Sequence, residues 1–214
     1  MTICFVAEKG YLAYGAAIRD EVERERPGFL SILLLETPPS YEGWLPPRAD
    51  LYLLPASFFL DLKPEARPEP LFAYGSEELI LEAMDSGCAD YLREPLDGME
   101  IEARARKLFS FRLRLGTVSL SCSAERLISG GQGQGSLTEA EFRLFRILAL
   151  NLNRPVPRAA LDYALKGQRG PRSRSVDVHM ASIRKKLEGL GPGTGAALKS
   201  VRGAGYILLG TACA

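Results

Sequence analysis

Hydrophobic positions in the first half of the chain form short apolar runs separated by amphipathic segments. The runs predict strands over residues 3–7, 29–35, 51–54, 71–74 and 89–92, with helices over residues 11–26, 76–86 and 99–109. Residues 29–35 are almost continuously apolar, which is typical of a strand covered on both faces. Residues 36–50 contain four prolines, so we expect a loop or a distorted helix there. Strands alternating with helices predict an α/β doubly wound parallel sheet of five strands.

The pattern changes after Phe109. Three short alternating segments predict a small antiparallel sheet, at residues 112–115, 118–121 and 126–128. The glycine-rich stretch 130–135 lacks the spacing of a phosphate-binding loop, and we interpret it as a flexible turn. After it come three predicted helices, from Leu137, over about residues 157–166 and over about residues 175–188, and a hairpin with strands at residues 198–201 and 206–209. Three helices followed by a hairpin predict an α+β winged helix.

The first of these three helices has a specific start signal. Thr138 can cap the helix, and Glu141 can return a hydrogen bond to the Thr138 backbone. Leu137 can pack onto Phe142 on the other side of the cap.

The third helix has two contrasting faces. At about 100° per residue, one face gathers the apolar positions Val176, Met180, Ile183 and Leu187, which we expect in the core. The opposite face carries Arg174, Val178, Ala181 and Lys185, with Ser182 on its flank. Small side chains would let this face approach the major groove, where a valine methyl can contact a thymine methyl. We therefore predict that it binds DNA; a merely solvated helix face is the alternative.

Arg202 lies at the tip of the predicted hairpin, next to the glycines at 203 and 205, which permit close backbone approach. A narrow minor groove attracts such a cation, although an ordinary exposed turn arginine would look the same in sequence. His179, the only histidine, lies beside the core face of the third helix. We expect it to pack or to contact a phosphate.

Charge divides the chain into two parts. Residues 1–111 carry 11 Lys/Arg and 20 Asp/Glu, a net charge of −9, and residues 112–214 carry 16 Lys/Arg and 6 Asp/Glu, a net charge of +10. We therefore predict two domains, residues 1–111 and residues 112–214, the second with a polyanionic partner. The alternative is two surfaces of opposite sign that attract each other.

The remaining composition points to a cytoplasmic globular protein. No apolar run reaches the roughly 18 residues of a membrane span, and the N-terminus has no basic region typical of a signal peptide. The four cysteines are scattered, which argues against a disulfide framework or a zinc site. We expect no cofactor, no metal and no membrane contact. Since no catalytic constellation is visible, we expect no enzymatic activity.

The C-terminal motifs resemble those of OmpR/PhoB-type response regulators of two-component systems. The resemblance is carried, in order, by residues 137–144, by residues 174–179 followed by residues 183–187, and by Val201-Arg202-Gly203-Ala204-Gly205-Tyr206. It implies a receiver-like (flavodoxin-like) domain followed by a winged-helix DNA-binding domain, with double-stranded DNA, a second copy of the chain and RNA polymerase as candidate partners. Ala181, Ser182 and Ile207 depart from the usual residues of this family, which leaves the sequence preference open.

The receiver-like half departs further from the resemblance. At the positions of the acidic pair, the phosphoacceptor, the hydroxyl residue and the lysine, this chain has Ala7-Glu8, Pro55, Ser76 and Glu94. An acyl phosphate needs a carboxylate nucleophile, a bound cation and a balancing positive charge. We predict an atypical receiver that is not phosphorylated in the usual way. A misalignment that makes Glu36, Asp61 or another acid the acceptor is the alternative.

The resemblance also implies a dimer face. The family positions correspond to Asp90, Arg104 and Glu100, with the arginine paired to the acid across the dimer, and we expect apolar contacts from Leu79, Ala83, Leu92 and Ala103. The favoured function is a phosphorylation-independent, dimeric, DNA-binding transcription regulator. Two alternatives are a regulator that senses a small molecule near Ala7, Pro55 and Gly75, and a protein-interaction module with weak DNA binding.

Overall fold

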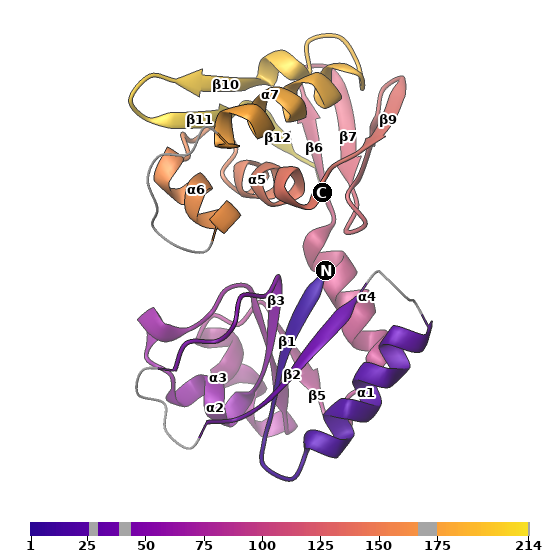
Figure 1. The fold of residues 1–214 in the computed structure, drawn as a ribbon, viewed down its shortest axis with the longest axis vertical. Coiled ribbons are helices and arrows are strands. Elements are labelled where there is room, and N and C mark those ends of the chain that lie inside the picture. The colour runs from indigo at the N-terminus through magenta and orange to yellow at the C-terminus, as the bar shows by residue number, and fades with distance from the viewer. Residues whose placement is uncertain (26–29, 39–43, 167–174, 214) are drawn as a thin grey trace. The chain divides into compact units, whose positions relative to one another are not determined.

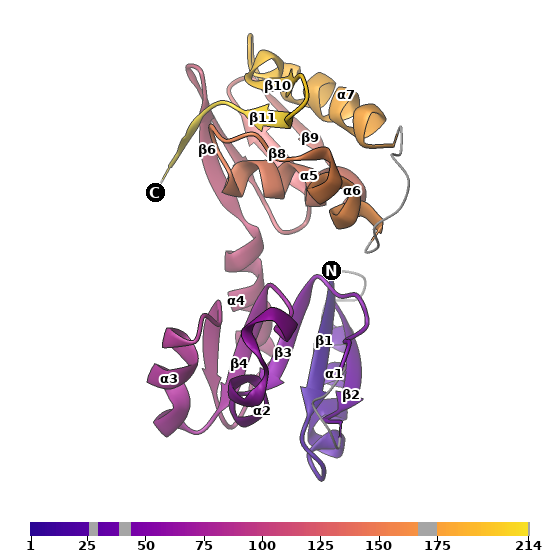
Figure 2. The same ribbon diagram turned by 90° about the vertical axis from the view of Figure 1, so that its left-hand side faces the viewer.

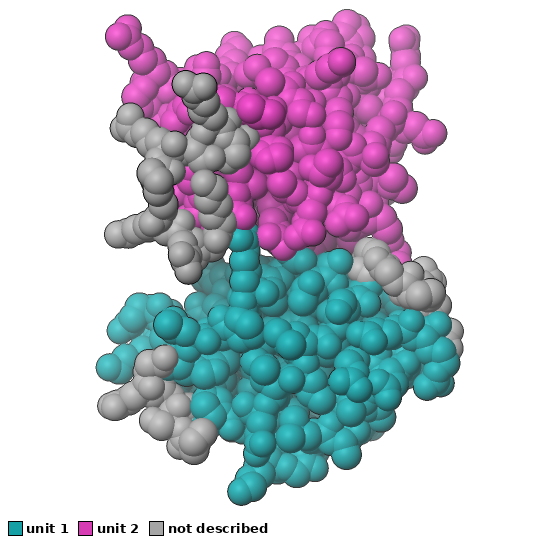
Figure 3. Space-filling view, in the orientation of Figure 1, with its two compact units in different colours: residues 1–105 teal, residues 106–214 magenta. Residues whose placement is uncertain are grey.

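A computed structural model describes residues 1–25, 30–38, 44–166 and 175–213. The chain forms two compact units, residues 1–105 and residues 106–214 (Figure 3). No helix among the described residues is both long and apolar enough to cross a membrane.

The first unit is built on a parallel sheet with the strand order β2-β1-β3-β4-β5 (Figures 1 and 2). Its strands are β1 (Thr2–Ala7), β2 (Ser31–Glu36), β3 (Leu51–Pro55), β4 (Leu71–Gly75) and β5 (Asp90–Arg93). This order belongs to the flavodoxin-like doubly wound fold, so the predicted fold class is confirmed. The carboxyl ends of β1, β3 and β4 lie together at one edge, because Phe5 is in register with Leu53 and Pro55 with Tyr74.

Helices cover both faces of this sheet (Figure 1). They are α1 (Leu12–Glu25), α2 (Ala56–Asp61), α3 (Ile80–Asp85) and α4 (Gly98–Phe109), with short 3-10 turns at η1 (Pro64–Ala66) and η2 (Glu77–Leu79). Neighbouring residues of a strand point to opposite faces, so Phe5 faces α1 while Cys4 and Val6 join the core under α2. Trp44, in the irregular segment after β2, packs edge-on against Phe58 of α2 at 4.9 Å between ring centroids.

Two local expectations for this unit are corrected, and one helix was missed. β2 is an edge strand, and Leu33 is 39% exposed, so the strand is not covered on both faces as its apolar run suggested. The helix expected over residues 76–86 is divided into η2 and α3. The helix α2, which directly follows Pro55, was not anticipated.

The second unit contains an antiparallel sheet of order β12-β6-β7-β8-β9 and a separate hairpin of β10 and β11. The strands are β6 (Phe111–Leu115), β7 (Val118–Cys122), β8 (Leu127–Gly130), β9 (Gly133–Ser136), β10 (Leu198–Val201), β11 (Gly205–Leu208) and β12 (Thr211–Ala212). The glycine-rich stretch is therefore not only a turn, since its second half is β9. A Cβ on Gly133 would lie 2.2 Å from the backbone oxygen of Gly189, so close packing requires glycine there.

Three helices complete this unit (Figure 1). They are α5 (Glu139–Leu150), α6 (Arg158–Lys166) and α7 (Ser175–Glu188), and a 3-10 turn, η3 (Gly195–Ala197), leads into β10. The helix α5 contacts the other two helices and the hairpin strand β11. The order of three helices and a hairpin confirms the predicted winged helix. Leu144, Phe145 and Leu148 of α5 are fully buried and form the centre of the core together with the apolar face of α7.

Candidate nucleic-acid interface

The two faces of α7 lie as the sequence predicts. Val176, Met180, Ile183 and Leu187 are buried, each 1% exposed or less. On the other side Val178 is 66% exposed, and Ala181 and Lys185 are also exposed. An exposed valine beside an alanine gives α7 a smooth outer face that the side chains of the described residues leave open. Arg174, expected at the start of this face, lies outside the described residues.

Ser182 and His179 are only partly exposed, unlike the residues of the outer face of α7. The Ser182 hydroxyl donates a hydrogen bond of 2.5 Å to Oε1 of Glu141, and its contact with DNA stays a prediction. His179 is partly buried beside the core face, and its contact with a phosphate stays a prediction.

Glu141 links the start of α5 to α7. Its Oε2 accepts hydrogen bonds from the Thr138 backbone at 2.7 Å and from Lys186 Nζ at 2.6 Å, and the Thr138 hydroxyl completes the predicted capping box. Burial by itself would raise the pKa of Glu141, but the hydrogen bonds from Lys186, Ser182 and Thr138 hold this pKa at about 2. The carboxylate therefore stays ionised and fixes α7 against α5.

The wing is fixed to the rest of the unit through Tyr206. Tyr206 and Val156 exchange backbone hydrogen bonds of 2.7 and 3.1 Å, and Arg184 donates to the Leu198 carbonyl at 3.0 and 2.9 Å. A Cβ on Gly205 would lie 2.0 Å from the Val156 oxygen. Gly205 thus serves this internal approach, and the expectation that it frees the backbone for DNA is corrected. Arg202 is exposed at the tip.

A polar triad joins α6, α7 and the wing. Arg158 Nη1 and the Tyr206 hydroxyl both donate to Oδ1 of Asp177 at 2.5 Å, and the Arg158 guanidinium lies 5.1 Å from the centre of the Tyr206 ring. Hydrogen bonds from Arg158 and Tyr206 lower the pKa of Asp177. Sequence reasoning missed Arg158 and Asp177; the only local signal was an arginine directly after Pro157 at a helix start.

The positions that the resemblance assigns to a phosphorylation site meet at the carboxyl edge of the first sheet. Pro55 is buried and is the last residue of β3. Glu8 is exposed, and its carboxylate accepts a 2.8 Å hydrogen bond from the Ser57 hydroxyl. Glu94 is exposed as well, and its backbone N–H donates to the Gly75 carbonyl at 3.2 Å. Ser76 is exposed, and its carbonyl accepts a 2.6 Å hydrogen bond from the Tyr91 hydroxyl.

Two carboxylates act on one tyrosine at this edge. Tyr74 is 4% exposed, and its hydroxyl donates to the Val6 carbonyl at 2.9 Å. Burial raises the pKa of Tyr74, and the negative charges of Glu8 and then Glu94 raise it further. Of the two acids named as alternative phosphoryl acceptors, Glu36 is the last residue of β2 and Asp61 is the last residue of α2.

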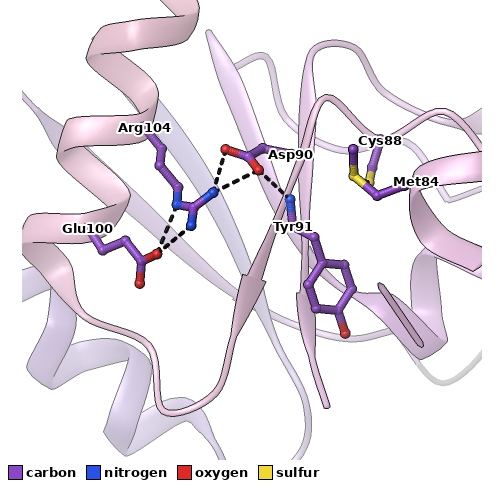
Figure 4. A network of polar contacts seen from close by, with 6 residues as sticks. All are labelled: Met84, Cys88, Asp90, Tyr91, Glu100 and Arg104. Atoms are coloured by element: carbon purple, nitrogen blue, oxygen red, sulfur yellow. Dashed lines mark hydrogen bonds and ion pairs between the residues drawn. The ribbon is translucent and has the colours of Figure 1, made fainter. Parts of the chain in front are cut away.

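The expected dimer face has its charged groups paired within the chain (Figure 4). Arg104 of α4 donates to both oxygens of Asp90 at 2.9 Å and to Oε1 of Glu100 at 2.7 and 2.9 Å. The pairing of Arg104 with Asp90 of a second copy stays a prediction. The expectation for Ala83 and Leu92 is corrected: both are 0% exposed and belong to the core of the first unit.

Other side chains of this face do reach the surface. Leu79 is partly buried and Ala103 is exposed. Leu81 and Met84 of α3 are 78% and 44% exposed, and Met99 of α4 is 46% exposed. The apolar surface available to a partner thus comes from α3 and the start of α4.

The exposed face of α7 and the adjoining wing define a winged-helix DNA-binding protein that carries a receiver-like unit. Residues 132–208 match the family described as "Transcriptional regulatory protein, C terminal". The chain belongs to the OmpR/PhoB-type family of response regulators, and it is a DNA-binding transcription regulator.

Two of the relatives match the chain over more than half of its length. The chain is 28% identical to the aerobic respiration control protein ArcA of Escherichia coli (strain K12) over 168 residues, which cover 70% of each chain. It is 31% identical to the transcriptional regulatory protein CpxR of Klebsiella pneumoniae subsp. pneumoniae (strain HS11286) over 154 residues, which cover 65% of this chain and 66% of that one. A solved structure of the Klebsiella pneumoniae RstA DNA-binding domain in complex with RstA box matches at 26% identity and a TM-score of 0.37, covering 46% of this chain and 96% of that one.

Proposed function

We propose that this regulator acts without phosphorylation of its first unit. The observation that carries the proposal is Pro55, which ends β3 where the family resemblance places the acceptor aspartate. Proline has no nucleophilic side chain, and it is buried here. An acyl phosphate cannot form at this position.

The surroundings of Pro55 would also oppose a phosphoryl group. The Glu8 and Glu94 carboxylates both raise the pKa of Tyr74, so they place negative charge at the same sheet edge. A phosphoryl group brings further negative charge and needs cations to balance it. Glu94 supplies a negative charge where the family resemblance places a lysine.

Incubation of the full chain with acetyl phosphate and Mg²⁺, followed by intact-mass measurement, tests this proposal. We expect no added phosphoryl group, while a response regulator with an acceptor aspartate, treated in parallel, gains one. A stable phosphoryl adduct on this chain would contradict the proposal. The variants Glu36→Gln and Asp61→Asn would then show which of the two alternative acids, if either, had accepted it.

The DNA contacts are proposed on a domain of residues 112–214, which lies within the second compact unit. Val178 and Ala181 face the bases of the major groove, Lys185 contacts a phosphate, and Arg202 enters the neighbouring minor groove. The 66% exposure of Val178 supports this orientation. His179 is proposed to contact a phosphate at the edge of the same face.

Dimerisation is proposed for residues 1–111, through α3, β5 and α4. Since Asp90, Arg104 and Glu100 are already paired within one chain, the exposed Leu81, Met84 and Met99 supply the apolar contact. Two copies would then place two winged helices on a repeated or inverted pair of half-sites. The small-molecule alternative has less support, because the buried Tyr74 is the register partner of Pro55 and the Tyr91 hydroxyl would lie 3.1 Å from a Cβ on Gly75.

A further inference from the structure

Arg158 occupies the first position of α6, beside the proposed DNA-facing side of α7. Its partner Asp177 directly precedes Val178 on α7. Asp177, Ala181 and Lys185 are spaced by four residues, so they follow one another along the same side of the helix. Arg158 therefore lies at the N-terminal end of this row, and Lys185 lies towards the other end.

The contacts of Arg158 hold its guanidinium in one orientation without burying it. Nη1 donates to Asp177, the guanidinium lies over the ring of Tyr206, and the side chain is still 46% exposed. An exposed ion pair of this kind adds little to stability. It does fix the planar set of N–H donors, which is the geometry that recognises phosphate oxygens.

The negative charge of Asp177 also needs an explanation at this place. Its side chain is 47% exposed, at the end of a surface that we propose meets a polyanion. A bare carboxylate there would repel phosphates, whereas a carboxylate that orients an arginine presents a cation in their path. In helix-turn-helix proteins the helix before the recognition helix crosses the DNA backbone, and α6 has that place in the order of elements.

We propose that Arg158 is a phosphate-binding residue of the DNA interface, held in its binding orientation by Asp177 and Tyr206. The inference rests on the proposed DNA contact of α7. It adds a backbone contact from α6 to the base contacts from α7.

The salt dependence of DNA binding tests this role. Binding of the full chain to a mixed-sequence duplex of about 30 base pairs is measured by fluorescence anisotropy over a series of salt concentrations. A lost phosphate contact lowers the slope of log affinity against log salt by about 1 and weakens binding similarly on all sequences. We expect Arg158→Gln to show this loss and a several-fold weaker affinity. Arg114→Gln, an exposed arginine of β6 with the same change of net charge, should keep the wild-type slope.

Asp177→Asn separates a phosphate contact from simple charge neutralisation. If Arg158 binds phosphate, the double variant Arg158→Gln/Asp177→Asn binds more weakly than Asp177→Asn alone. If Arg158 only neutralises Asp177, the double variant regains wild-type affinity, and the proposal is wrong. Arg158→Lys keeps the cation and should keep the slope, so the test survives if the glutamine variant folds poorly.

The outcomes also separate this inference from the proposed function. A wild-type slope in Arg158→Gln overturns the role of Arg158 and leaves the other DNA contacts standing. A wild-type chain that does not bind the duplex even at low salt would overturn the DNA contact of α7 and this inference with it. Neither outcome depends on phosphorylation.

Discussion

At the scale of single residues, Glu141 shows how one side chain can have two structural roles. The sequence indicates the first role, because Thr138 and Glu141 have the spacing of a capping box. The second role depends on the fold: Ser182 and Lys186, which are distant in sequence, donate to the same carboxylate. No local pattern around Glu141 reports these partners.

The pH dependence of stability should report this carboxylate. Its pKa is about 2 in the folded chain against an ordinary value of 4.5, so its ionised form stabilises the fold. That contribution, on the order of 3 kcal/mol, is fully present above pH 4.5 and is lost as the pH falls towards 2. We expect Glu141→Gln to lower the free energy of unfolding at pH 7 by about this amount, measured by urea denaturation.

The difference between wild type and Glu141→Gln should shrink as the pH falls below 4.5. Glu139→Gln is the matched control, because Glu139 is an exposed acid in the same helix turn. We expect it to change stability by less than about 0.5 kcal/mol. Equal effects of the two variants would show that the buried contacts of Glu141 do not stabilise the fold.

At the scale of elements, the helix α7 matches its sequence pattern most closely. Its bounds and its buried face follow from the period of apolar residues, because a helix with one apolar stripe can bury only that stripe. The wing was also predicted in outline. The sequence did not predict the role of Gly205, because its close approach to Val156 joins segments about fifty residues apart.

The exposed face of α7 predicts different consequences for two substitutions. Val178→Ser should leave stability within about 0.5 kcal/mol of wild type, because the side chain is 66% exposed. It should lower affinity for sites selected from random duplex DNA and change the preferred base near the lost methyl contact. Lys185→Ala should instead weaken binding to all sequences and lower the salt slope by about 1.

The control for Val178 is Leu150→Ser, a similarly exposed apolar residue at the end of α5. We expect this variant to keep the wild-type sequence preference in the same selection. An unchanged preference in Val178→Ser would show that α7 does not read the bases through this residue.

At the scale of the whole molecule, the opposite charges of the two halves correspond to different tasks. The net charge of +10 in residues 112–214 suits a unit that binds a polyanion. The acidic first half keeps the doubly wound sheet of a receiver. Pro55 and Glu94, however, occupy the positions where the family resemblance places the acceptor aspartate and the lysine. We therefore propose that this half serves assembly.

The dimer face can be tested on the full chain. Leu81→Glu places a charge on the most exposed apolar residue of α3 and should weaken self-association at least tenfold, measured by analytical ultracentrifugation. Leu127→Glu makes the same change at a residue of β8 that is 56% exposed, and it should leave association unchanged. A wild-type chain that is monomeric at micromolar concentration would contradict the proposed dimer.

The sequence by itself determined the fold class, the two-unit pattern of charge, the buried face of α7 and the position of Pro55, because periodicity, composition and residue type are local properties. Only the tertiary structure decided that β2 is an edge strand, that Arg104 pairs with Asp90 inside one chain, and that Ala83 and Leu92 are buried. It also brought Arg158, Asp177 and Tyr206 together. Contacts between distant segments depend on how the elements pack, and no periodicity within a single element encodes them.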